Sequence, residues 1–255
     1  MTLYESARLA HIAVGTVVLA SFWGAALVRK GSVPHRRFGR AYVAAMTVLL
    51  AATLVLATGS AMAGDPMRAV FNVYVSLISV ASVWMAWSSI AHRADFQRYR
   101  AWPYRLICLL LGGYGLFLLS IVPRMGVPAR MAMVGAFAVL GLSIAGAMAW
   151  RLIRGADQPR WWLSEHLTAM SVNFAATHAS FSLLALSAVF PALKAPWTRT
   201  AILVAWMTSA LVVRLWAGRR FGGSVPAVRR HRGAAGGVVQ GGQPTDPRGR
   251  DLLER

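Results

Sequence analysis

The stretch AYVAAMTVLLAATLVLATGSAMA, residues Ala41–Ala63, decides the fold class, because it contains no charged side chain. The hydrocarbon core of a bilayer is about 30 Å thick, so a helix needs about 20 residues to cross it. A backbone surrounded by lipid must satisfy its own hydrogen bonds, which favours a helix over other structures. The stretch therefore predicts a transmembrane helix.

The rest of the chain repeats this pattern of long apolar stretches between short charged clusters. Hydrophobic residues make up 57% of the 255 residues, and charged residues only 14%. We therefore predict an all-α, polytopic bundle of about seven transmembrane helices. The predicted spans are Leu9–Val28, Ala41–Ala63, Ala69–Ala91, Leu106–Val122, Met131–Trp150, Leu167–Phe190 and Ala201–Gly218.

The distribution of Lys and Arg predicts the orientation of this bundle, because cytoplasmic loops carry an excess of these residues. With the N-terminus outside, 21 of the 27 Lys and Arg residues fall on the inner side and 6 on the outer side. Interface-seeking tryptophans gather near the same predicted inner boundary. They are Trp87, Trp102, Trp150, Trp161, Trp162 and Trp216. We predict a multi-pass protein of a bacterial inner membrane, with its N-terminus out and its C-terminus in.

The C-terminal segment differs in composition from the rest of the chain. Residues 219–255 are rich in Gly, Pro and Arg and lack apolar periodicity, which is typical of a disordered segment. We therefore divide the chain into a transmembrane domain, residues 1–218, and a disordered basic cytoplasmic tail, residues 219–255.

The predicted partner of this protein is the lipid bilayer. The arginines of the tail are expected either to bind anionic lipid headgroups, at about 1 kcal/mol each, or only to fix orientation and solubility. The net charge of +19 does not predict nucleic acid binding, because the positive residues lie in short loops and the tail. Protein partners are not indicated by any motif.

A sequence motif links the first two spans to a known group of proteins. His11 is followed by Gly15, and after the first span comes His35-Arg-Arg-Phe-Gly-Arg40. The segment resembles a bacterial family of predicted membrane proteins of unknown function, over roughly residues 9 to 60. Such proteins tend to carry a second basic segment after the third span, which His92 matches in part. The resemblance implies a multi-span membrane protein and no particular activity.

Histidines are the first candidates for chemistry, because a neutral imidazole enters a membrane more easily than a fixed charge. His35, His92 and His166 lie near the predicted inner boundary, where they are candidate ligands of a metal or haem. The alternative is ordinary interfacial histidines bonded to water or headgroups. His11 and His178 lie within spans, but at predicted depths that differ by about 15 Å, which argues against a simple haem pair.

The predicted span 167–190 carries the strongest pattern of polar residues. One stripe recurs at spacings of four and three residues, and a second polar side is turned away from it. The first stripe contains Ser164, Thr168, Ser171, Ala175, His178 and Ser182, and the second side contains Met170, Asn173, Thr177 and Ser180. A helix that is polar on two sides is expected to be buried in the bundle. The stripes either pack neighbouring helices or line a cavity.

These patterns give three functional hypotheses. The first is a non-enzymatic protein that binds or passes a small molecule through a polar interior. Its candidate ligand residues are His178, Asn173, Ser171, Thr177 and His11. The second is a membrane redox protein with haem or metal on histidines, and the third is a structural or lipid-interacting protein.

Two further expectations concern charged residues. All eight carboxylates lie in predicted loops, termini or at a helix start, which disfavours a proton relay built on buried acids. Arg214, near the end of the last predicted span, is expected to extend its guanidinium toward the interface.

Overall fold

The computed structural model describes residues 3–124, 126, 128–155, 159–183, 189–191 and 195–221. Within these residues the regular structure is all helical, with eight α-helices and one 3-10 turn. The α-helices are α1 (Leu3–Leu27), α2 (Val33–Met62), α3 (Pro66–Ala91), α4 (Phe96–Tyr99), α5 (Trp102–Ile121), α6 (Pro128–Arg154), α7 (Trp161–Phe181) and α9 (Pro196–Phe221), and the 3-10 turn η1 spans Val122–Arg124. Beyond residue 221, the predicted tail lies outside the described residues.

Six of the described helices are long and apolar enough to cross a membrane. These are α1, α2, α3, α5, α6 and α9, and they correspond to six of the seven predicted spans. The chain is therefore a multi-span integral membrane protein whose helices contact lipid. The remaining predicted span corresponds to α7, a helix of 21 residues that is polar along its length and is not among the six. Seven crossings stay a prediction.

Several helices begin earlier than the apolar pattern predicts. α2 begins at Val33 rather than Ala41, because the Ser32 hydroxyl accepts a hydrogen bond from the His35 backbone N–H and caps the helix. Asp65 caps α3 in the same way. A proline in the first turn of each helix loses no helical hydrogen bond. His35 and the arginines that follow it therefore lie in the first turns of α2 rather than in a loop.

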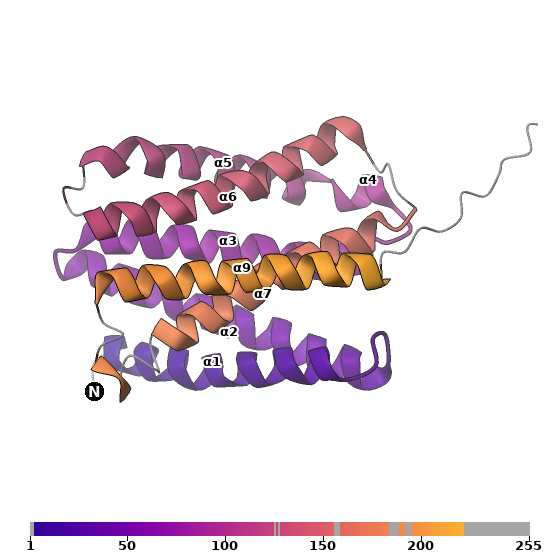
Figure 1. Cartoon of the computed structure of the whole chain (residues 1–255), viewed down its shortest axis with the longest axis horizontal. Coiled ribbons are helices and arrows are strands. Elements are labelled where there is room, and N and C mark those ends of the chain that lie inside the picture. Colours follow the sequence, from indigo (N-terminus) through magenta and orange to yellow (C-terminus); the bar gives the residue numbers. More distant parts are fainter. Residues whose placement is uncertain are drawn as a thin grey trace, which may run out of the picture. The chain divides into compact units, whose positions relative to one another are not determined.

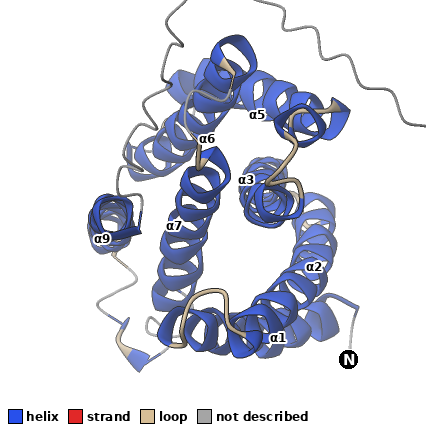
Figure 2. Ribbon diagram, turned by 90° about the vertical axis from the view of Figure 1, so that its right-hand side faces the viewer, coloured by secondary structure: helices blue, strands red, loops and turns tan. Residues whose placement is uncertain are grey.

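Two pairs of helices that follow each other in sequence pack side by side and antiparallel (Figure 1). α1 packs on α2 and α5 packs on α6, while α3 lies between the two pairs and contacts α2 and α5. α7 packs on α3 and α9, and it runs obliquely between the α5–α6 pair and α1 (Figure 2). The exposed fraction of Asn173 on this helix is 1%. The buried position of α7 agrees with its two polar sides.

The contact of α3 with α5 and α6 is built around Tyr74, which is fully buried. The Tyr74 hydroxyl lies 3.4 Å from the carbonyl oxygen of Leu111 on α5 and 3.4 Å from that of Ala138 on α6. A Cβ atom at Gly115 would lie 2.5 Å from this hydroxyl, and one at Gly141 would overlap it. Both glycines therefore leave the space that the phenol occupies.

We predict that Gly141→Ala lowers the free energy of unfolding by about 1–3 kcal/mol, because the added methyl group overpacks the core. The matched control is Gly146→Ala on the same helix, where a Cβ atom meets nothing within 4 Å. The control should be neutral, or stabilising by up to about 1 kcal/mol from helix propensity. Thermal unfolding of both variants in detergent measures the difference, and equal midpoints would contradict the role of Gly141.

Candidate functional site

A cavity of about 390 Å³ lies between α3, α6, α7 and α9. Its volume is within the range of roughly 300–1,000 Å³ that is typical of small-molecule sites. Its charged lining residues Arg151, Glu165 and Arg214 come from the end of α6, the start of α7 and the last third of α9. These parts of the three helices lie toward one end of the bundle (Figure 1). The lining residues are Ser82, Met85, Ile144, Ala147, Met148, Trp150, Arg151, Ser164, Glu165, Thr168, Ala169, Val172 and Arg214. The cavity thus combines ionic and hydroxyl groups with an apolar wall.

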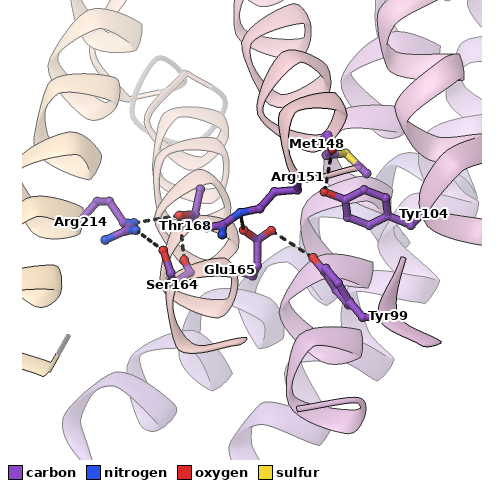
Figure 3. Close-up of polar contacts among 8 residues, drawn as sticks. All are labelled: Tyr99, Tyr104, Met148, Arg151, Ser164, Glu165, Thr168 and Arg214. Atoms are coloured by element: carbon purple, nitrogen blue, oxygen red, sulfur yellow. Dashed lines mark hydrogen bonds and ion pairs between the residues drawn. The ribbon is translucent and has the colours of Figure 1, made fainter. Parts of the chain in front are cut away.

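Glu165 is the central ionic group of this cavity (Figure 3). Its Oε1 lies 2.9 Å from Arg151 Nε, and its Oε2 accepts a hydrogen bond of 3.1 Å from the Tyr99 hydroxyl. Burial, followed by the nearby Glu165 carboxylate, raises the pKa of Tyr99, so the phenol keeps the proton that it donates. Both carboxylate oxygens are therefore engaged by protein groups.

Glu165 lies near the start of a helix, as the sequence predicts, but the bundle buries it. The exposed fraction of its side chain is 8%. Because α7 begins at Trp161 rather than Leu167, Glu165 lies in the second turn of the helix. Arg151 near the end of α6 and Glu165 near the start of α7 flank one short connection, and this is the sequence signal that could have indicated the pair.

Arg214 reaches from α9 to two hydroxyl groups of α7. Its Nε donates to Thr168 Oγ1 at 2.8 Å, and its Nη2 donates to Ser164 Oγ at 2.9 Å. Ser164 and Thr168 are one helical turn apart, so their side chains face the guanidinium together (Figure 3). In the described part of the chain, no carboxylate forms an ion pair with Arg214. Rather than only extending toward the interface, this arginine is held against α7 by uncharged oxygens.

The deeper polar residues of α7 serve helix packing. Asn173 accepts a hydrogen bond of 3.0 Å from Ser82 Oγ on α3 and donates one of 3.0 Å to the Ala169 carbonyl oxygen. Ser171 Oγ donates to the carbonyl oxygen of Leu167, one turn earlier. The structure therefore places Asn173 and Ser171 beside the cavity rather than among its lining residues. Thr177 lies farther along α7, next to the Tyr42 hydroxyl of α2.

His178 has a hydrogen-bond partner at each ring nitrogen. Its Nδ1 lies 2.8 Å from the Phe174 carbonyl oxygen, and its Nε2 lies 2.9 Å from Trp23 Nε1 on α1. A carbonyl accepts and an indole N–H donates, so the geometry assigns the neutral Nδ1–H tautomer. The rings of Phe22 and Trp206 also contact the imidazole. A metal or haem at Nε2 would have to displace the Trp23 indole.

Two of the interfacial histidines, His35 and His166, are within electrostatic range of each other. Nδ1 of His35 donates to the Ala25 carbonyl oxygen at 3.0 Å, and Nδ1 of His166 donates to that of Ala86 at 2.9 Å. His166 is within electrostatic range of both His35 and Lys30. In each imidazole, donation from Nδ1 leaves Nε2 with the lone pair.

The other two candidate histidines do not join this pair. His92 Nδ1 lies 3.1 Å from the carbonyl oxygen of Ser88 on its own helix. His11 Nδ1 lies 3.2 Å from Thr53 Oγ1 on α2. Across the residues that can be described, no three His, Cys, Asp or Glu side chains come together in a group that could hold a metal ion. His35, His92 and His166 therefore do not come together as one metal site in the described structure.

We predict that Glu165→Gln destabilises the protein by about 3 kcal/mol, because it leaves the Arg151 charge without its ionic partner. The amide keeps the shape of the side chain and can still accept from Tyr99. The control is Glu5→Gln, which removes the same charge at an exposed position of α1 and should change stability by less than about 1 kcal/mol. Denaturant unfolding in detergent compares the two variants, and similar effects would show that the ion pair contributes little.

No family model, curated protein or solved structure matches this chain. The resemblance of residues 9 to 60 to bacterial membrane proteins therefore stays a prediction.

Proposed function

We propose that this membrane protein binds a small anionic ligand in the cavity between α3, α6, α7 and α9. The observation that carries the proposal is the state of Arg214, whose guanidinium has two hydroxyl partners and no carboxylate partner among the described residues. A charge removed from water is costly unless an opposite charge accompanies it. An anion in the cavity supplies that charge.

Glu165 attracts Arg214 electrostatically but forms no ion pair with it, because its two oxygens bind Arg151 and Tyr99. The cavity lining therefore holds two arginines against one carboxylate, which favours an anion over a cation. Arg214 uses Nε and Nη2 for α7, while Nη1 lies over Gly218, 2.9 Å from where a Cβ atom would stand. A guanidinium held in this way presents further N–H groups to a carboxylate or phosphate.

The proposal includes an orientation, with the N-terminus outside, the C-terminus in the cytoplasm and the cavity in the inner half of a bacterial inner membrane. It is supported by the excess of Lys and Arg on the predicted inner side. The basic first turns of α2, the end of α6 and the end of α9 lie at one end of the bundle (Figure 1).

The second candidate function is a redox protein that carries haem or a metal on His35 and His166. It is favoured by their hydrogen bonds, because donation from Nδ1 to a carbonyl is the usual arrangement of a ligating imidazole. An optical spectrum of the purified protein tests it. A Soret band that shifts on reduction with dithionite would support this candidate, and a featureless spectrum from folded protein would count against haem.

We predict that Arg214→Gln weakens anion binding about tenfold, because one fully engaged charge is lost. Inorganic phosphate, sulfate and acetate are titrated into the protein in nonionic detergent and followed by calorimetry. The matched control is Arg219→Gln, which removes the same charge from an exposed position of α9 and should leave binding unchanged.

A second variant tests the same guanidinium without removing a charge, so the proposal can still be tested if Arg214→Gln does not fold. Gly218→Ala keeps every charge, but its methyl group displaces Nη1 of Arg214, and it should also weaken binding. Anion binding that is the same in the wild type, Arg214→Gln and Gly218→Ala would overturn the proposal.

A further inference from the structure

The cavity changes from polar to apolar along the helices that line it. On α7, Ser164, Glu165 and Thr168 come first, and Ala169 and Val172 follow toward the middle of the bundle. Ser164 and Val172 are separated by eight residues, which corresponds to about 12 Å along a helix. The ionic groups thus lie at one end of the cavity, whereas the lining hydroxyl of Ser82 on α3 lies deeper and is bound to Asn173.

The α6 wall has the same order. Arg151 lies three residues from the end of this helix, whereas Met148 and Ile144, both buried, lie progressively deeper. The polarity of the cavity therefore falls from the end of the bundle toward its middle on both walls. A lipid in a bilayer has the same gradient, from its headgroup to its acyl chain.

Two exposed tryptophans place the charged end at the depth of the headgroups. The exposed fraction is 54% for Trp150 and 56% for Trp216. Exposed tryptophans of membrane helices concentrate at the boundary between headgroups and acyl chains. Trp150 is adjacent to Arg151, and Trp216 is two residues from Arg214. The two guanidinium groups of the cavity therefore lie close to the level of lipid phosphates.

The cavity is also accessible from the lipid side. α9 packs mainly on α7 and only slightly on α6. Two lining residues of α6, Ala147 and Trp150, are exposed on the surface of the bundle. A ligand that is already in the membrane can therefore reach the cavity between α6 and α9 without crossing the protein.

Positive charge continues from the cavity to this surface. The Arg154 guanidinium lies 4.5 Å from the centre of the Trp150 ring, and that of Arg220 lies 5.8 Å from the centre of the Trp216 ring. Arginines near a membrane surface attract acidic headgroups. The rim of the opening and the cavity are both positively charged, so both favour a negatively charged ligand.

We infer that the ligand of this cavity is an acidic phospholipid of the surrounding leaflet. This inference rests on the proposed anion-binding function and adds the class of the ligand. The phosphate lies at Arg214 and Arg151, and an acyl chain follows the apolar wall of Met148, Ile144 and Val172. A free oxyanion would make the ionic contacts but leave the apolar part of the cavity unused.

The experiment compares three probes on the full-length protein in nonionic detergent, by calorimetric titration. The probes are dioctanoyl phosphatidic acid, dioctanoyl phosphatidylcholine and inorganic phosphate. We expect the phosphatidic acid to bind at least tenfold more tightly than either of the others, and Arg214→Gln to reduce its affinity about tenfold.

Two further variants separate the headgroup from the chain. Ala147→Phe places a ring at the exposed apolar wall, so it should weaken the binding of phosphatidic acid and leave that of inorganic phosphate unchanged. Val139→Phe adds a ring at an exposed position of α6 that does not line the cavity, and it should change neither.

The possible results distinguish the acidic phospholipid ligand from the anion-binding function on which it rests. Equal affinity for phosphatidic acid and inorganic phosphate, both dependent on Arg214, would overturn the lipid inference and leave the anion-binding function standing. Equal affinity for phosphatidic acid and phosphatidylcholine would overturn the requirement for an acidic headgroup. Binding that does not depend on Arg214 for any probe would overturn both proposals.

Discussion

The position of α7 depends on finding a partner for each polar group that the helix carries into the bundle. Hydrocarbon offers no hydrogen bonds, so an unpaired hydroxyl, amide or carboxylate would destabilise the helix by several kcal/mol. Arg151 and Tyr99 satisfy Glu165, Ser82 satisfies Asn173, and Trp23 satisfies His178. These partners come from α6, α4, α3 and α1. A single polar helix thus fixes the arrangement of the helices around it.

The same requirement separates the two kinds of site along α7. Where the partners are complete, as at Asn173 and His178, the polar groups hold helices together and offer little to a ligand. Arg214 differs, because its partners supply oxygen atoms but no charge. The ligand-binding capacity of the bundle is therefore greatest at the charged end of α7 rather than around the histidine in its middle.

Much of the fold could be predicted from the sequence, because an apolar run long enough to cross a bilayer has few alternatives. The buried position of α7 also followed from its two polar sides. The helix starts were less predictable, since caps such as Ser32 extend α2 into the charged segment before it. The site was the least predictable part. Polar residues of α7 were visible as a stripe, but which of them meet Arg214 and which meet α3 depends on the packing of distant helices.

The fit of Tyr74 against Gly115 and Gly141 has a consequence for how this sequence can evolve. The hydroxyl occupies the volume that a side chain at either glycine would need, so the three positions share one fixed space on three different helices. Substitution at a glycine becomes acceptable only after the phenol has been shortened. In homologous chains, a larger residue at the position of Gly141 should therefore occur together with a smaller one at the position of Tyr74, and the order of the two changes should be the same in each lineage.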